Sequence, residues 1–382
     1  MDRDDPWSVT DRDLHDRLAA LRDADATAAV ATVVDVEGSA YRRPGAKLVA
    51  PGDDDALGAI TAGCLEGPVA SLAADARESG TAAVETFDLM DGDEWGLGLG
   101  CNGVIDVLVE PLDDSFDPLL AALDDGESAA VLTAIASDDP DVPLGARTVV
   151  TADGEDAGDD RSGLPDGALA DLRDAAAEAR ESGTSGVVTV ERAAGDLRVF
   201  VDGVEPTPDL VLFGSQNDVH PVARVGADAG FRVTVASARG ARADTDQFPN
   251  AHRVVGTHPT EIGDALDRPS RAHVVLMSHN LVDDQLALEH LLTETDVPYV
   301  GLMGPRERFE ELREALADDG VTLTPDQLDR VSTPVGLDLG DGSPTGIALS
   351  IVSEALAVAN DAEGGRLRDQ SGPIHPRTDP TP

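Results

Sequence analysis

The chain has 382 residues, 41% of them hydrophobic, which suffices for more than one buried core and predicts two domains. It carries 74 acidic and 28 basic residues, a formal net charge of −46, and Lys47 is its single lysine. Such a charge repels nucleic acid and anionic membranes, so we expect neither as a partner. Because the acids are spread through every segment, we interpret them as adaptation to molar salt, where charges are screened within roughly 3 Å. A disordered acidic tail and an acidic binding surface are the alternatives.

The sequence predicts a cytoplasmic protein. No apolar run approaches the roughly 20 residues that a membrane-spanning helix needs. Residues 1–13 are charged and lack the apolar stretch of a signal peptide. In the cytoplasm thiols stay reduced, so we expect the two cysteines, Cys64 and Cys101, to be free. A disulfide between them is the alternative.

The first half of the chain alternates helices and strands. Leu14, Leu18 and Leu21 recur at helical spacing after Thr10, which is a suitable cap for that helix. The elements expected next are strands at 28–36, 47–50 and 56–61, a helix at 68–78, strands at 82–87, 104–109 and 147–151, a helix at 169–182, and a hairpin at 186–191 and 197–202. No internal repeat is evident.

The second half follows a stiff linker. The pair of prolines in Glu205-Pro206-Thr207-Pro208 predicts a domain boundary near residue 206. We therefore expect domains at 1–205 and 206–360, and a polar, frayed tail at 361–382. Beyond the boundary, apolar runs alternate with helical segments, which indicates a parallel sheet covered on both faces and hence a Rossmann-like α/β domain. Its strands are expected at 210–213, 232–236, 253–255, 273–277 and 299–303.

Two short segments bracketed by glycines contain both cysteines: Gly63-Cys64-Leu65-Glu66-Gly67 and Gly100-Cys101-Asn102-Gly103. Each lies where a predicted helix or strand begins, and Cys64 precedes a helix N-terminus, where unpaired N–H groups favour a thiolate. Glycine lets a ligand approach the backbone closely. Two cysteines without C-x-x-C spacing or nearby histidines do not make a zinc site.

The segment from Gly38 to Lys47 gathers positive charge in an acidic protein. It holds Arg42, Arg43 and the single lysine in a loop that also contains Gly45. Retaining cations there predicts an anion ligand such as a phosphate. Ion pairing with neighbouring acids is the alternative.

The turn after the first strand of the second domain departs from the dinucleotide fingerprint. It begins at Gly214, but Gln216 and Val219 replace the second and third glycines of G-x-G-x-x-G. Ordinary NAD(P) binding is therefore not expected. His279 follows a later strand at the carboxyl edge, where such sheets bind ligands, although a histidine there can also serve as a cap.

Gly304 and Arg306 form a second strand-to-helix turn in the same domain. Gly304 suits the turn itself, and Arg306 near a helix N-terminus suits a phosphate. A solvated surface arginine is the equal alternative.

Taken together, these motifs resemble the XdhC/CoxI family, accessory proteins of xanthine dehydrogenase and related molybdenum hydroxylases. The resemblance covers most of the chain from about residue 28 to 358. The runs that carry it are 31–34, 38–47, 63–66 and 95–101 in the first half, and 212–214, 248–249, 278–279, 299–304, 334–340 and 347–351 in the second.

The resemblance implies a cofactor chaperone rather than a turnover enzyme. Such a protein would bind the molybdenum–pterin cofactor (molybdopterin), support its sulfuration and insert it into an apo-hydroxylase of the xanthine dehydrogenase, CO dehydrogenase or aldehyde oxidoreductase type. It implies Cys101 as the cofactor-binding thiol, in contact with molybdenum, and Cys64 as a second candidate thiol. Arg42 and Lys47 would hold the pterin phosphate. A cysteine desulfurase is a further expected partner, and homodimerisation is a family-level expectation.

The motifs and the resemblance together give one set of expected cofactor-binding positions: Ser39, Arg42, Gly45, Lys47, Gly63, Cys64, Glu66, Gly100, Cys101, Asn102, Gly103, Gly214, His279, Gly304 and Arg306. The chain departs from the family pattern at Tyr41, where proline is usual, at Asn102, where glycine is usual, and in the turn after Gly214. Two alternatives stay open. One is a nucleotide-dependent oxidoreductase, which the turn at Gln216 disfavours, and the other is a degenerate structural subunit that binds a partner, which these departures favour.

Overall fold

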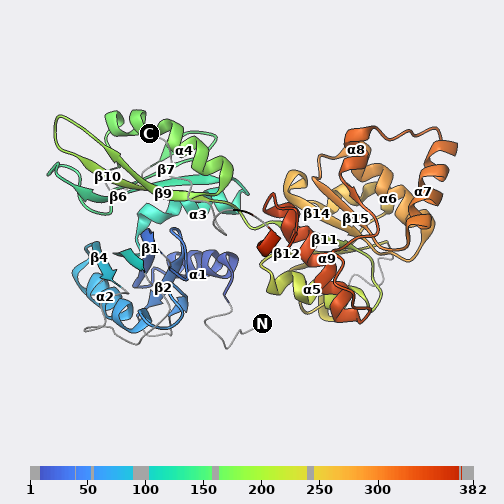
Figure 1. Ribbon diagram of the computed structural model, residues 1–382, viewed down its shortest axis with the longest axis horizontal. Coiled ribbons are helices and arrows are strands. Elements are labelled where there is room, and N and C mark those ends of the chain that lie inside the picture. The colour runs from blue at the N-terminus through green and yellow to red at the C-terminus, as the bar shows by residue number, and fades with distance from the viewer. Residues whose placement is uncertain are drawn as a thin grey trace. The chain divides into compact units, whose positions relative to one another are not determined.

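The computed structural model describes residues 9–38, 40–52, 56–88, 103–156, 163–238, 245–369 and 371. Their contacts divide the chain into two compact units, one ending at Pro206 and the other beginning at Thr207. The N-terminal unit holds antiparallel sheets with helices, and the C-terminal unit holds a six-stranded parallel sheet (Figure 1). This confirms the predicted fold class, a mixed α/β domain followed by a Rossmann-like parallel-sheet domain, although the sixth strand was not predicted. None of the helices within the described ranges has the length and apolar character that crossing a membrane requires.

The first sheet of the N-terminal unit is built around one long buried strand. Its strand order is β3-β2-β1-β5-β4, with every neighbouring pair antiparallel. Thr10 and Asp13 form a capping box on the first helix, which confirms the predicted cap. The elements are α1 (Asp11–Asp23), β1 (Ala28–Gly38), β2 (Lys47–Pro51), β3 (Leu57–Gly58), α2 (Glu66–Ser79), β4 (Ala83–Asp88) and β5 (Gly103–Pro111).

The second sheet repeats this arrangement. Its order is β8-β7-β6-β10-β9, again all antiparallel, and its second helix also lies between the third and fourth strands. The elements, after a short turn of 3-10 helix at Asp114–Phe116, are α3 (Asp117–Asp124), β6 (Ala129–Ser137), β7 (Arg147–Val150), β8 (Glu155–Asp156), α4 (Asp166–Ser182), β9 (Ser185–Val190) and β10 (Leu197–Val204).

The N-terminal unit therefore consists of two copies of one structural repeat, and the prediction that the chain has no internal repeat is wrong. We call α1 to β5 the first repeat and α3 to β10 the second; each reads α-β-β-β-α-β-β. Even the irregularities agree, because the pairing of the first strand with the fifth skips one residue at Val34 and, in the second repeat, at Ile135. Sequence traces remain in Gly45-Ala46-Lys47 against Gly145-Ala146-Arg147, and in Ala-Arg-Glu-Ser-Gly-Thr at both 76–81 and 179–184.

The two sheets of the N-terminal unit pack on each other through equivalent residues. Their shared core cluster contains Val34 and Ile135, with Leu108 and Phe200. Val84 and Val187 pack against it from equivalent positions, since they pair with Leu108 and Phe200 in the sheets. The helices α2 and α4 pack on separate clusters of their own sheets (Figure 1). The contact between sheets thus has the reciprocal character of an isologous dimer interface.

The C-terminal unit has the strand order β13-β12-β11-β14-β15-β16, all parallel, which is the order of a Rossmann fold. The helices α5 and α9 pack on one face and α6 and α7 on the other (Figure 1). The elements are β11 (Asp209–Phe213), α5 (Val219–Asp228), β12 (Arg232–Ser237), β13 (Arg253–Gly256), β14 (Ala272–Leu276), α6 (Leu281–Glu294), β15 (Tyr299–Leu302), α7 (Arg306–Asp318), α8 (Pro325–Asp329), β16 (Val331–Ser332) and α9 (Pro344–Ala359).

Candidate functional site

The strand directions of the first sheet bring the predicted N-terminal segments to one end of that sheet. β1 ends at Gly38, which pairs with Gly103 at the start of β5, and β4 ends at Asp88, opposite Val104. β3 runs in the same direction as β1, because both are antiparallel to β2. The loops at 40–46 and 59–65 therefore lie at the end of the sheet where Gly103 enters it. We call this the loop end of the first sheet.

The loop that carries Cys64 is held in place by Glu66. The backbone N–H of Thr61 donates to Glu66 Oε1 at 2.9 Å, and the Thr61 hydroxyl donates to Oε2 at 2.7 Å. The buried Leu65 donates its N–H to the same carboxylate at 3.1 Å. Gly63 takes a φ of +110°, which only glycine adopts without strain. Glu66 thus shapes this loop directly, whichever ligand the loop binds.

Cys64 itself is a free, half-buried thiol beside the start of α2. It packs against the core of the first sheet together with Ala40 and Ala46, which belong to the loop at 40–46. Cys64 and the cationic loop therefore pack on the same hydrophobic core. Gly100, Cys101 and Asn102, like Ser39, lie outside the described residues, and the chain is described again from Gly103 onward.

The cationic loop separates into a paired and an unpaired part. Lys47 donates to Asp202 Oδ2 at 2.5 Å and to the carbonyl of Gly45 at 3.1 Å, and its side chain is only 13% exposed. Lys47 is therefore ion-paired, as in the alternative to phosphate binding, but its partner belongs to the second sheet and is not one of the neighbouring acids. Within the described residues, by contrast, the guanidinium groups of Arg42 and Arg43 have neither an ion pair nor a hydrogen bond, and Arg43 is exposed.

The ion pair of Lys47 belongs to a polar cluster inside the N-terminal unit. Asp202 also accepts a hydrogen bond from the Ser185 hydroxyl at 2.6 Å. Burial, followed by the charge of Lys47, lowers the pKa of His15 to about 4. His15 is consequently neutral at pH 7. A Cβ added to Gly45 would lie 3.0 Å from the Ser185 oxygen, so this glycine permits the close approach of loop and cluster.

The predicted residues of the C-terminal unit meet at the carboxyl edge of its sheet. Gly214 follows β11 and packs closely against the backbone after β14, because an added Cβ would lie 2.7 Å from the carbonyl oxygen of Met277. His279 has a left-handed φ of 60° and bonds through Nε2 to Asp218 Oδ2 at 2.7 Å. This bond spans β11 and β14, the pair where the strand order reverses and where such folds bind ligands.

The turn at Gly304 and Arg306 rests on a buried acid that the sequence did not single out. Asp284 accepts from the Ser278 hydroxyl and from Arg308, both at 2.6 Å. Gly304 has a φ of +131°, and a Cβ there would lie 2.7 Å from the Arg308 side chain. Arg306 is exposed at the first residue of α7. Neither Asp284 nor Asp218 belongs to a recognisable motif, so only the packing of the strands reveals them.

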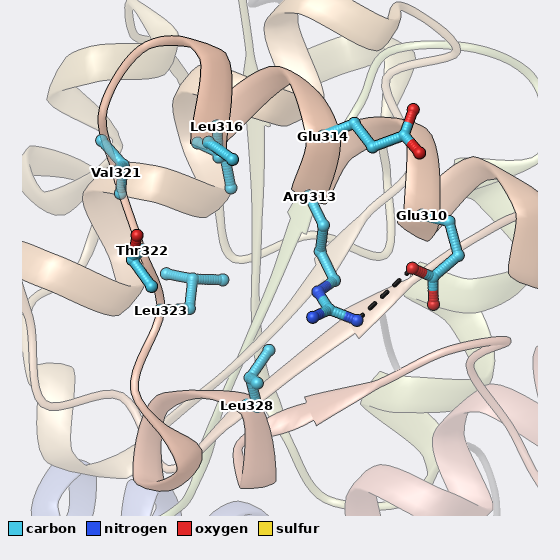
Figure 2. Close-up of a pocket in the computed structure, with 9 residues that line it drawn as sticks. Glu310, Arg313, Glu314, Leu316, Val321, Thr322, Leu323 and Leu328 are labelled. Carbon is cyan, nitrogen blue, oxygen red and sulfur yellow. Dashed lines mark hydrogen bonds and ion pairs between the residues drawn. The ribbon is translucent and has the colours of Figure 1, made fainter.

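A pocket of about 260 Å³ opens in the C-terminal unit, and none of the predicted residues lines it. Figure 2 shows apolar side chains such as Leu316, Val321 and Leu323 on one side and, on the other, Arg313 paired with Glu310. The distance of this ion pair is 3.3 Å. With Glu314 beside this pair, the charged groups of the pocket sum to one negative charge, which does not suit an anionic cofactor. The lining residues are Glu310, Arg313, Glu314, Leu316, Ala317, Val321, Thr322, Leu323 and Leu328.

Comparison with known proteins identifies the family. The model of the XdhC and CoxI family matches residues 21–88, and the model of the XdhC Rossmann domain matches residues 210–355. The chain belongs to the XdhC/CoxI family, which confirms the resemblance found in the sequence.

Individual relatives agree with this assignment. A Bacillus subtilis protein that is named as a probable xanthine dehydrogenase subunit is 26% identical over 348 residues, 90% of this chain and 96% of that protein. A crystal structure of a xanthine dehydrogenase from Bacillus halodurans matches with a TM-score of 0.72 and 26% identity, over 92% of this chain and 96% of that one. The uncharacterized protein YqeB of Escherichia coli is 29% identical over 182 residues, 47% of this chain and 32% of that protein.

Proposed function

We propose that this protein is an accessory factor of a xanthine dehydrogenase-type molybdenum hydroxylase, and that it binds the molybdenum–pterin cofactor and inserts it into the apo-enzyme. Membership of the XdhC/CoxI family supports the accessory role. The cofactor would remain bound here during its sulfuration, with a cysteine desulfurase as sulfur donor. When bound, the cofactor supplies the molybdenum centre and the oxidation–reduction chemistry of the client enzyme.

The observation that carries the proposal is the meeting of a thiol loop and a cationic loop at the loop end of the first sheet. Cys64 and Arg42 lie in loops that leave the sheet together, and Cys101 precedes Gly103 by two residues in the chain. A soft sulfur ligand suits molybdenum, and guanidinium groups suit a phosphate. These donors therefore fit the two ends of a metal–pterin phosphate.

The chain's own residues divide the work in this proposal. Cys101 provides the principal thiol and Cys64 the second, in a loop that Glu66 keeps in one conformation. The glycines at 63, 100 and 103 let the ligand approach the backbone. In the C-terminal unit, Gly214, His279, Gly304 and Arg306 at the carboxyl edge of the sheet would bind a nucleotide or a surface of the client.

Equilibrium binding of molybdopterin from a competent donor, in molar salt, tests the proposal. We expect saturable binding to the wild type, a loss of at least tenfold in affinity for Cys101→Ser, and a smaller loss for Cys64→Ser. Each cysteine variant is the matched control for the other, and near-ultraviolet circular dichroism checks that both fold. If the wild type binds no molybdopterin, the proposal is wrong; saturable NAD binding with hydride transfer would indicate the oxidoreductase alternative instead.

A further inference from the structure

We propose that Tyr41, Arg42 and Arg43 form a subsite for a flat, phosphorylated heterocycle, in which the two guanidinium groups hold the phosphate and the Tyr41 ring stacks on the heterocycle. We call these residues the Tyr-Arg-Arg subsite. The inference rests on the proposed function, because it specifies how the pterin and its phosphate would be held. It also removes Lys47 from the phosphate site.

The internal repeat separates scaffold from function at these positions. Lys47 begins β2 opposite Thr32, and Arg147 begins β7 opposite Thr133, so the two cations are equivalent. Each crosses to an acid of the other repeat: Lys47 to Asp202 and Arg147 to Glu110. A cation present in both repeats, and paired in the same reciprocal way, belongs to the scaffold that joins the sheets.

The Tyr-Arg-Arg subsite has no such counterpart. The turn before β2 is closed by the N–H of Ala46 donating to the carbonyl of Arg43, and the turn before β7 by Ala146 donating to Pro143. Counting back from these bonds places Tyr41, Arg42 and Arg43 opposite Asp141, Val142 and Pro143. One aromatic and two cationic residues are thus replaced by an acid and two apolar residues, although the backbone turn is the same.

The subsite is open to a ligand and lacks internal partners. Tyr41 is 65% exposed, the largest exposed fraction among the large hydrophobic side chains of the described residues. Neither arginine has an ion pair or side-chain hydrogen bond within those residues, in a chain with a net charge of −46. Two adjacent like charges without a partner repel each other, and a bound anion relieves that repulsion.

The chemistry of the three side chains matches one ligand class. Guanidinium groups bind phosphate through paired, charge-assisted hydrogen bonds. An exposed aromatic ring stacks on flat heterocycles, a contact worth roughly 1–3 kcal/mol for nucleobases. The subsite is at the loop end of the first sheet, where Ala40 and Ala46 of the same loop share a core cluster with Cys64. A ligand held here would therefore lie at the same end of the sheet as the loop that carries Cys64.

The test measures molybdopterin binding by fluorescence in molar salt for Arg42→Ser, Arg43→Ser, Tyr41→Phe and Tyr41→Leu. Arg173→Ser is the matched control, because Arg173 is another exposed arginine of this unit without a partner among the described residues. We expect each loop arginine variant to lose about tenfold in affinity. Tyr41→Leu should lose a similar factor, while Tyr41→Phe and Arg173→Ser should bind as the wild type does.

A pterin without a phosphate sharpens the assignment. Its affinity should fall in Tyr41→Leu and stay unchanged in the arginine variants, since only the ring contact remains. If the wild type binds molybdopterin and all loop variants bind as tightly as Arg173→Ser, this inference is wrong while the proposed function stands. Loss of client binding with unchanged molybdopterin binding would also overturn it, and would make the loop a protein-docking surface.

Discussion

The two repeats of the N-terminal unit share a scaffold and differ in their loops. Both contain the same seven elements in the same order, with the same bulge and the same turn before the second strand. Between the fourth and fifth strands, however, the first repeat has the connection that contains Cys101, residues 89–102, and the second has residues 191–196. The thiols and the Tyr-Arg-Arg subsite belong to the first repeat alone.

This difference separates stability from ligand binding. Residues present in both repeats, such as Lys47 and Arg147, hold the sheets together. Residues found only in the first repeat are free to bind a ligand, because the equivalent turn in the second repeat forms without them. The two repeats of one chain therefore distinguish scaffold residues from ligand-binding residues, a distinction that otherwise requires a set of related sequences.

The largest expected loss of stability comes from breaking the ion pair between Arg147 of the second repeat and Glu110. Arg147 and Glu110 are 4% and 2% exposed, and the guanidinium also lies 4.0 Å from the centre of the Phe116 ring. Arg147→Ala leaves a buried carboxylate without its partner, so the free energy of unfolding should fall by about 3–5 kcal/mol. Denaturant unfolding in molar salt measures this. The double change Arg147→Met with Glu110→Leu should recover much of the loss, and a loss below about 1 kcal/mol in the single variant would contradict the assignment.

The equivalent ion pair of Lys47 with Asp202 should contribute less to stability than the pair of Arg147 with Glu110. Breaking it also tests whether Lys47 takes part in ligand binding. Its side chains are more exposed, 13% for Lys47 and 6% for Asp202, so Lys47→Met should cost about 2 kcal/mol. Molybdopterin affinity should stay within about twofold of the wild type in Lys47→Met, measured where the variant is fully folded. A tenfold loss of affinity in the folded variant would return Lys47 to the phosphate site.

Much of this fold follows from the sequence, because the signals are local. The capping box at Thr10, the strands of the C-terminal unit and the hairpin before the linker depend on neighbouring residues only. The repeat was not predicted because few identical residues mark its two copies, which lie 100 positions apart at Gly45 and Gly145. The strand pairing and the reciprocal ion pairs that define it become visible only in the fold. The predicted strand at 56–61 proved to be only Leu57–Gly58, since Thr61 is drawn into the hydrogen bonds of Glu66.

The sequence predicts which residue types form the candidate site but not which side chains pair with them. The cationic loop and the glycine–cysteine segments stand out in composition, and topology brings them to one end of the sheet. What composition does not reveal is which cation is already neutralised, because Asp202 lies 155 residues from Lys47 in the chain. Asp218 and Asp284 belong to no recognisable motif, so the sequence did not single them out either.

The pH dependence of stability should reveal a contribution of His15, which belongs to the first repeat; the second repeat contains no histidine. The pKa of His15 in the folded protein is about 4, below its ordinary value of 6.5, so the unfolded chain binds a proton more readily between these values. The stability that this histidine contributes is present above pH 6.5 and is lost as the pH falls toward 4. His15→Gln should flatten the profile of unfolding free energy against pH in this range, by about 3 kcal/mol at most given the size of the pKa shift. The difference between the unfolding profiles of variant and wild type isolates the effect from the titration of the acids; parallel profiles would show that His15 does not contribute.

The smallest expected effect is on the glycines that end α2 and α4, where the two repeats should agree. Gly80 and Gly183 close these helices with φ values of 66° and 63°, each after Glu-Ser and before Thr. Alanine in this left-handed conformation costs roughly 1 kcal/mol. An added Cβ meets nothing within 4 Å at Gly80 but lies 3.3 Å from the flexible Glu205 side chain at Gly183, so Gly183→Ala should cost the same or slightly more. Thermal unfolding of both variants in one buffer checks this. Costs that differ by more than about 1 kcal/mol would show that equivalent caps carry unequal strain, and would limit how far one repeat can serve as the reference for the other.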